Sequence, residues 1–150
     1  IDKLISKYNL SDYILLFPFC SEHLQQKKWP YYDQLIKLIK QNHPNLKIVI
    51  APGPDEIEKA KKLDAVSILK EDKAISISEL AGLIKRSKFV VANDTGPAHM
   101  AAHLNVKGLS LFGSHTTAYK VSIERENFKA IQVSDLKNLS AQKVFERLVL

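Results

Sequence analysis

The segment with the clearest potential for chemistry runs from Asn93 to His99, directly after the apolar run Phe89–Ala92. A strand that ends in a tight turn and enters a helix leaves unpaired backbone N–H groups at the helix start. Gly96 lets the backbone approach a ligand closely, and Pro97 sets a helical φ in the first turn. Together with the Thr95 hydroxyl and the His99 ring, this positive helix end favours binding of a phosphate-like anion.

Two other interpretations of this segment stay open. Asp94 and Thr95 could serve only as helix caps, with Gly96-Pro97 as a simple turn and His99 as an ordinary surface residue. Alternatively, His99 and His103 stand at i and i+4, a spacing that suits metal ligands on a helix. Because the sequence offers no third ligand beside this pair, we expect no metal site.

A second polar loop follows the apolar run Tyr13–Phe17 and leads into Lys27-Lys28-Trp29-Pro30. A lysine in this loop can reach the same crevice as the helix start near Thr95 and offer an ammonium group to a pyrophosphate. The alternative for Lys27 is a solvated charge. For Trp29 we favour a role as a hydrophobic anchor beside the next helix.

A third loop, Pro52-Gly53-Pro54-Asp55-Glu56, follows the apolar run 47–51. A carboxylate at such a strand end can accept hydrogen bonds from ribose hydroxyls, as acidic residues do in dinucleotide-binding folds. The alternative is that Asp55 and Glu56 only complement the dipole of the following helix, and local physics alone favours it.

Short apolar runs that alternate with helical patterns surround these loops. We expect strands at 13–17, 47–51, 65–69, 89–92, 108–112 and 130–133, with helices at about 30–42, 55–63, 76–86 and 97–104 and from 140 onwards. Strands that read as continuous apolar runs, with no hairpin signals between them, indicate a parallel sheet covered on both faces. The expected fold class is therefore α/β, a Rossmann-like doubly wound domain with its chemistry at the carboxyl ends of the strands.

Composition excludes several classes of protein. The chain has 150 residues, a net charge of +6 and one cysteine, Cys20, which cannot form an internal disulfide. No apolar run approaches the ~18 residues that span a bilayer, so we expect a cytoplasmic protein. The positive charge favours an anionic partner, but scattered basic residues without RNA-module or zinc-finger signatures argue against nucleic acid.

Three motifs follow one another along the chain: Lys27-x-Trp29-Pro30, the Gly-Pro loop with its acidic residues, and Asp94-Thr95-Gly96-Pro97-x-His99. In this combination the sequence resembles glycosyltransferase family 9, which contains the ADP-heptose:lipopolysaccharide heptosyltransferases. The resemblance runs from about Tyr13 to the end of the chain. It implies the C-terminal half of a GT-B fold, with residues 1–12 as an interdomain connection, 13–150 as the donor-binding domain, and the N-terminal acceptor domain outside the chain.

The resemblance also implies roles for particular residues. Lys27 would contact the phosphate or ribose region of the donor, Ser21 its phosphate and Glu56 its ribose. Ile75 would frame the adenine. The diphosphate and sugar end would be held by Asp94, Thr95, Gly96, Pro97 and His99.

The function implied is transfer of a heptose or related sugar from an ADP-linked donor to the lipopolysaccharide inner core. The general base would be a carboxylate of the N-terminal domain, so no catalytic residue is expected in this chain and the chain alone should be inactive. The donor is a substrate, and we expect no cofactor. Membrane contact would be peripheral, at the inner face of the cytoplasmic membrane.

Three alternatives stay open. Another GT-B enzyme, such as a sugar-nucleotide 2-epimerase, needs no acceptor. A non-catalytic nucleotide-binding module would fit a gene that encodes only these residues. A basic nucleic-acid-binding domain would show steeply salt-dependent affinity for oligonucleotides.

Overall fold

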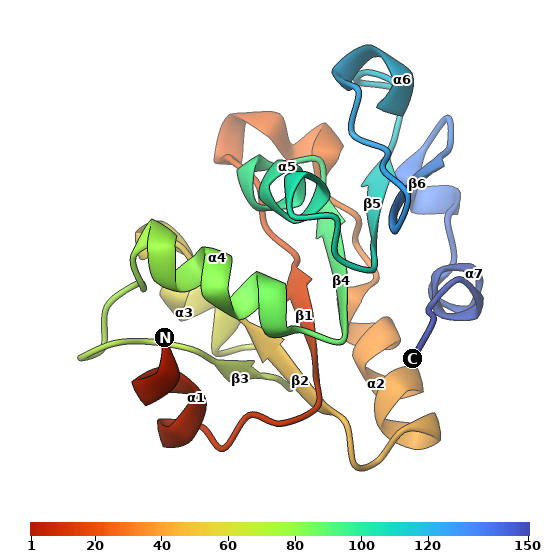
Figure 1. Cartoon of the computed structure of the whole chain (residues 1–150). Coiled ribbons are helices and arrows are strands. Elements are labelled where there is room, and N and C mark those ends of the chain that lie inside the picture. The colour runs from red at the N-terminus through yellow and green to blue at the C-terminus, as the bar shows by residue number, and fades with distance from the viewer.

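A computed structural model describes all 150 residues and places a six-stranded parallel sheet at the centre of the chain (Figure 1). The strand order is β3-β2-β1-β4-β5-β6, and every paired neighbour runs parallel. The strands are β1 (Tyr13–Phe17), β2 (Lys47–Ile50), β3 (Val66–Ser67), β4 (Phe89–Asn93), β5 (Gly108–Phe112) and β6 (Phe128–Gln132). The expected α/β doubly wound fold is confirmed.

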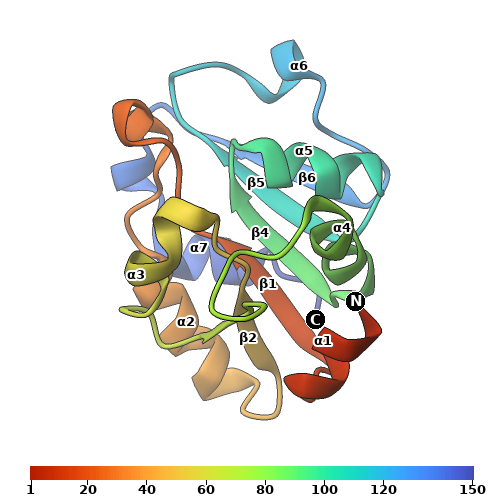
Figure 2. The ribbon, with the colours of Figure 1, turned by 90° about the vertical axis from the view of Figure 1, so that its left-hand side faces the viewer.

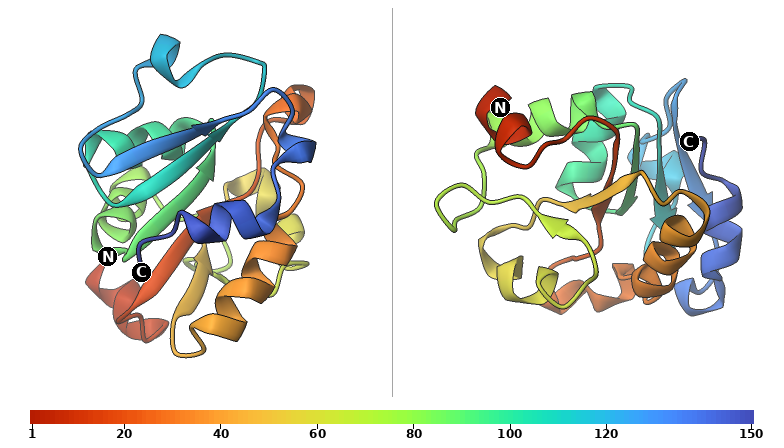
Figure 3. Two further views of the ribbon diagram at one scale, coloured as in Figure 1. Left: turned by 90° about the vertical axis from the view of Figure 1, so that its right-hand side faces the viewer. Right: turned by 90° about the horizontal axis from the view of Figure 1, so that it is seen from below.

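Helices cover both faces of the sheet (Figure 2; Figure 3). The α-helices are α1 (Asp2–Lys7), α2 (Tyr32–Asn42), α3 (Ile57–Ala60), α4 (Ile77–Arg86), α5 (Gly96–His103), α6 (Ala118–Val121) and α7 (Ala141–Glu146). Short 3-10 segments are η1 (Glu22–Lys27), η2 (Pro54–Glu56) and η3 (Leu136–Asn138). The longest helix has 11 residues, and none is long and apolar enough to cross a membrane.

Side chains from the two faces of the sheet form two separate cores. On one face, α1, α4 and α5 contribute buried residues such as Leu4, Leu83 and Ala101. On the other, α2, α3 and α7 contribute residues such as Ile36 and Val144. Because β1, β2, β4 and β5 are buried on both faces, these strands read in the sequence as nearly continuous apolar runs.

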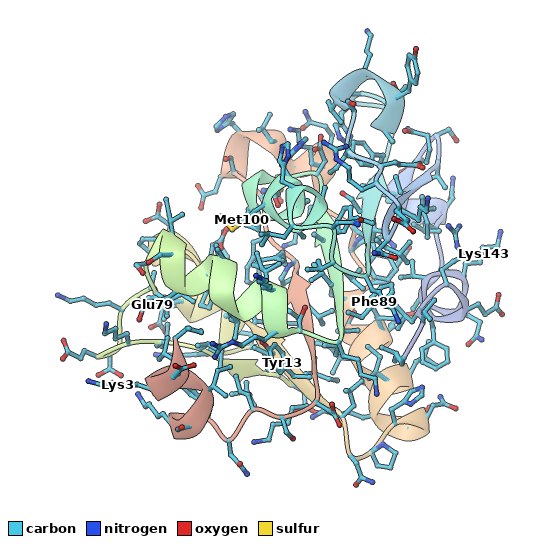
Figure 4. The ribbon with its side chains drawn as sticks, in the orientation of Figure 1. Lys3, Tyr13, Glu79, Phe89, Met100 and Lys143 are labelled. Atoms are coloured by element: carbon cyan, nitrogen blue, oxygen red, sulfur yellow. The ribbon has the colours of Figure 1, made fainter.

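Tyr13, labelled in Figure 4, connects the start of β1 to α4. Its hydroxyl donates to the carbonyl of Leu83. Burial raises the pKa of Tyr13 to about 12, so this donor keeps its proton. α1 packs beside α4, with Leu4 and Leu10 buried and Asp2 Oδ1 at 2.6 Å from Arg86 Nη1. Residues 1–12 therefore lie against the domain, and their role as an interdomain connection stays a prediction.

Several expected boundaries need correction. The helix expected over 55–63 is a 3-10 turn followed by the four-residue α3, since Ala60 is its one buried residue and no apolar face supports a longer helix. The last strand begins at Phe128 rather than Ala130. Part of the loop expected between 18 and 26 folds into η1, with Leu24 in a non-helical conformation.

Candidate functional site

The sheet places the carboxyl ends of β1 and β4 side by side, with Phe17 in register with Ala92. Since the chain winds in opposite directions from β1 and from β4, their ends mark the topological switch point, where open α/β sheets form a binding crevice. The loop after β1 carries Lys27, and the loop after β4 carries the segment from Asp94 to His99. Both loops lie at the end of the sheet where the strand arrows point in Figure 1.

The start of α5 is free to bind an anion. Thr95 occupies the N-cap position but makes no capping bond; its hydroxyl donates instead to the carbonyl of Asn93 over 3.3 Å. The backbone N–H groups of Gly96 and Ala98 have no hydrogen-bond partner in the chain, and Pro97 has no N–H. The interpretation in which Asp94 and Thr95 only cap the helix is therefore wrong.

The Asp94 carboxylate lies at the centre of a polar cluster. Its side chain is 6% exposed, with Oδ1 at 3.3 Å from His99 Nε2 and Oδ2 at 3.0 Å from His115 Nε2. Lys27 Nζ lies 3.6 Å from Oδ2. Lys27 and His99 thus converge on the end of β4 as the sequence predicts.

The exposure of the cluster decides which members can reach a ligand. The side chains of Lys27 and His99 are 26% and 38% exposed, whereas those of Asp94 and His115 are almost fully buried. The Lys27 ammonium offsets the single Asp94 carboxylate, so the cluster carries no excess negative charge toward an incoming anion. An anion at the start of α5 would meet the accessible Lys27 and His99.

A cavity of about 320 Å³ opens beside this cluster, at the carboxyl ends of β1, β2 and β4. Five of the predicted donor contacts line this cavity: Ser21, Glu56, Ile75, Thr95 and Pro97. Of the predicted contacts outside the polar cluster, Gly96 alone does not border it. Its walls are mostly apolar with a few polar groups, as in small-molecule sites, and its volume is at the lower end of the range for such sites.

Glu56 is already engaged within its own loop. Its Oε1 accepts a hydrogen bond of 2.8 Å from the N–H of Gly53, and this bond fixes the turn between β2 and α3. The other carboxylate oxygen makes no hydrogen bond in the chain. One oxygen of the Glu56 carboxylate thus fixes the local turn, and the other remains available as a hydrogen-bond acceptor at the cavity.

Asn93, to which the sequence analysis gave no role, connects the two loops. Its buried Oδ1 accepts from the backbone N–H of Trp29 over 3.3 Å and from the Tyr32 hydroxyl over 3.2 Å. Burial holds the pKa of Tyr32 well above its ordinary value, so the hydroxyl stays a donor. Trp29 is fully buried and donates its indole N–H to the carbonyl of Leu139, which confirms its expected role as an anchor.

His115 is the other residue that the sequence analysis missed. It lies in the loop after β5, which pairs with β4. The sequence feature that could have revealed His115 is its position three residues after the end of β5, beside the loop that carries Asp94. No group of three or more His, Cys, Asp or Glu side chains in the structure is placed to hold a metal ion.

Comparison with known proteins identifies the family. The model of glycosyltransferase family 9 (heptosyltransferase) matches residues 3–148. Lipopolysaccharide heptosyltransferase 1 of Campylobacter coli is 29% identical over 114 residues, which cover 70% of this chain and 33% of that protein. The chain therefore spans about a third of the length of this relative.

Solved structures show the same fold. E. coli heptosyltransferase WaaC with ADP has a TM-score of 0.78 at 24% identity, covering 91% of this chain and 43% of that chain. The UDP-GlcNAc 2-epimerase of Methanocaldococcus jannaschii, in complex with UDP-GlcNAc and UDP, has a TM-score of 0.64 at 15% identity, covering 98% and 41%. With the family model matching nearly the whole sequence, the chain belongs to glycosyltransferase family 9, the heptosyltransferase family.

Proposed function

We propose that this chain is the donor-binding domain of a glycosyltransferase that transfers a heptose or related sugar from an ADP-linked donor. The observation that carries the proposal is the convergence of Lys27, His99 and the unpaired N–H groups of α5 at the switch point of the sheet. The diphosphate would lie there, and the nucleoside would extend into the cavity lined by Glu56 and Ile75. The solved complex of WaaC with ADP, a protein of similar fold, supports the choice of nucleotide.

The domain would promote transfer by stabilising the leaving group. As the bond between the anomeric carbon and the diphosphate breaks, negative charge grows on the phosphate oxygens. The N–H groups of α5, Lys27 and His99 would interact more strongly with this charge in the transition state than in the ground state. Because Lys27 and the helix end supply positive charge, the scheme requires no metal ion and no cofactor.

The remaining parts of the reaction would come from outside these residues. We place the general base, a carboxylate that deprotonates the acceptor hydroxyl, in an N-terminal domain facing this one. The acceptor would be the lipopolysaccharide inner core, a proposal supported by the name of the Campylobacter coli relative. The enzyme would then work at the cytoplasmic face of the membrane with peripheral contact. The UDP-GlcNAc 2-epimerase, which represents the alternative enzyme, has the same fold as this chain. Its TM-score is lower than that of WaaC, and its name lies outside the family whose model matches the chain.

Calorimetric titration with ADP, with and without magnesium, tests the proposal. The chain should bind ADP in both conditions, and Lys27→Ala and His99→Ala should each raise Kd by about tenfold, the size expected for one lost interaction with a charged group. Lys28→Ala and His103→Ala provide matched controls, since both side chains are exposed neighbours that make no contact with Asp94. Absence of binding to a folded chain, or equal affinity in all four variants, would contradict the proposal.

A further inference from the structure

His115 is the most buried ionisable side chain in contact with Asp94. Its side chain is 4% exposed, and its ring stacks on Phe112 with centroids 5.7 Å apart and planes 10° from parallel. Stacking and burial together hold the imidazole in one orientation, with Nε2 directed at Asp94 Oδ2 over 3.0 Å. Its Nδ1 is buried without a partner, so the contact with Asp94 is the single side-chain hydrogen bond of this ring.

The loop that carries His115 is fixed from β6. Gln132 Nε2 donates to the carbonyls of Gly113 and Thr116 over 2.7 and 3.2 Å, and Gln132 Oε1 accepts from the N–H of Ala118 over 3.0 Å. These bonds bracket His115 on both sides. The loop is therefore held in place although it lies on the surface, and the imidazole meets Asp94 without a further rearrangement.

The direction of the hydrogen bonds to Asp94 follows from its chemistry. An ionised carboxylate only accepts, so the Nε2 atoms of His99 and His115 both carry hydrogen and donate. Each imidazole occupies a different oxygen, His99 on Oδ1 and His115 on Oδ2. The carboxylate is thereby prevented from rotating about its terminal bond.

His115 and Lys27 share the same carboxylate oxygen. The His115 contact is the shorter, at 3.0 Å, while Lys27 Nζ stays at 3.6 Å, beyond ordinary hydrogen-bond distance. Without the His115 donor, Oδ2 would be free to turn toward Lys27 and form a close ion pair. A lysine engaged in this way is less available to a diphosphate, because the ligand must first displace the carboxylate.

We propose that His115 is a positioning residue that holds Asp94 Oδ2 and so keeps Lys27 available for the diphosphate of the donor. This inference rests on the proposed donor-binding function. His115 acts through Asp94 and Lys27 and does not itself contact the nucleotide. Its removal weakens ADP binding only as long as Lys27 is present.

The test is a double-mutant cycle of ADP binding with His115→Phe and Lys27→Ala. His115→Phe keeps an aromatic ring over Phe112 but removes the Nε2 donor, and should raise Kd by up to about tenfold, the full loss expected when Lys27 no longer interacts with the diphosphate. His115→Gln, which returns an N–H donor of similar reach, should restore most of the affinity. In the Lys27→Ala background, His115→Phe should cause no further loss.

The controls separate the possible failures. His103→Ala removes an exposed histidine and should leave Kd unchanged, and thermal unfolding of each variant confirms that it is folded. Wild-type affinity in His115→Phe, or an equal loss with and without Lys27, would overturn the positioning role and leave the donor-binding function intact. Failure of the wild-type chain to bind ADP would instead overturn the proposed function, and the positioning role with it.

Discussion

Trp29 donates its backbone N–H to the buried Oδ1 of Asn93, and this bond fastens the loop after β1 to the end of β4. Lys27 stands two residues before Trp29, and Asp94 directly follows Asn93. The position of the ammonium relative to the carboxylate therefore depends on a neutral amide that contacts neither charge. Tyr32, at the start of α2, donates to the same oxygen and reinforces the connection.

Replacing Asn93 with Ala should both destabilise the chain and weaken ADP binding. The variant leaves the N–H of Trp29 and the hydroxyl of Tyr32 buried without an acceptor, at a cost of about 1–3 kcal/mol in the free energy of unfolding. Urea unfolding measures this loss, and calorimetry measures the affinity of the folded fraction. Asn42→Ala, which removes an exposed amide bonded to Leu38, is the matched control and should have little effect on either. Unchanged stability in Asn93→Ala would show that the connection is unimportant.

Gly96→Ala should separate folding from binding. A methyl group at this position meets no atom within 4 Å, and the residue does not have a positive φ. The variant should fold as well as the wild type, with a gain of up to about 0.5–1 kcal/mol from reduced freedom of the unfolded chain. ADP affinity should fall, because the methyl group occupies space at the helix start that we assign to the diphosphate. Undiminished affinity would mean that no ligand approaches this part of the backbone.

The same substitution at Gly108 should have the opposite effect. A methyl group there would lie 2.7 Å from the carbonyl oxygen of Val90 and 2.8 Å from the ring of Phe128, so β4 and β6 would have to move away from β5. We expect a loss of at least about 1–3 kcal/mol in the free energy of unfolding, the usual cost of overpacking. Chemical denaturation of the Gly108→Ala and Gly96→Ala variants side by side is the measurement. Equal stability of the two would contradict the described packing.

The Glu79 carboxylate, labelled in Figure 4, should make stability depend on pH under acid conditions. The backbone N–H and then the hydroxyl of Ser76, with a smaller effect of Lys70, lower its pKa from 4.5 to about 2. The folded state thus favours the charged form, and the stabilisation is complete above pH 4.5 and disappears as the pH falls through about 2.

Glu79→Gln, which keeps a side-chain acceptor for the Ser76 N–H but has no charge, isolates this effect. Urea unfolding at a series of pH values should show the wild type more stable than the variant at neutral pH, with the difference shrinking between pH 4.5 and about 2. A difference that stays constant over this range would show that the hydrogen-bonded carboxylate does not titrate as described.

Much of the sheet could be predicted because its central strands β1, β2, β4 and β5 are buried on both faces. β1 and β5 match the expected ranges at both ends, since each is a continuous apolar or small-residue run that ends at a turn. β6 was harder, because exposed Lys129 and the preceding Asn127 interrupt the apolar pattern at its start. α1 was missed because a six-residue segment with one buried leucine has no periodic signal, and its packing depends on a surface formed by distant α4.

The candidate site could be predicted only in part, for a similar reason. Lys27, Asp94 and His99 lie in the segments that follow β1 and β4, and these segments converge because the strands are parallel neighbours. His115 and Asn93 act through contacts that depend on register and side-chain direction, which the pattern of residue types does not reveal. Asn93 looks like a turn residue in the sequence, yet it is the fully buried end of β4.

The most direct test of the donor-binding account is a crystal structure of the chain with ADP. We expect phosphate oxygens within about 3 Å of the N–H groups at the start of α5 and of Lys27 Nζ, the usual hydrogen-bond distance. The adenine should lie in the cavity beside Ile75, with the ribose near Glu56. ADP bound elsewhere, for example in the groove beside Lys59 and Lys62, with the start of α5 unoccupied, would show that the start of α5 is not the donor site.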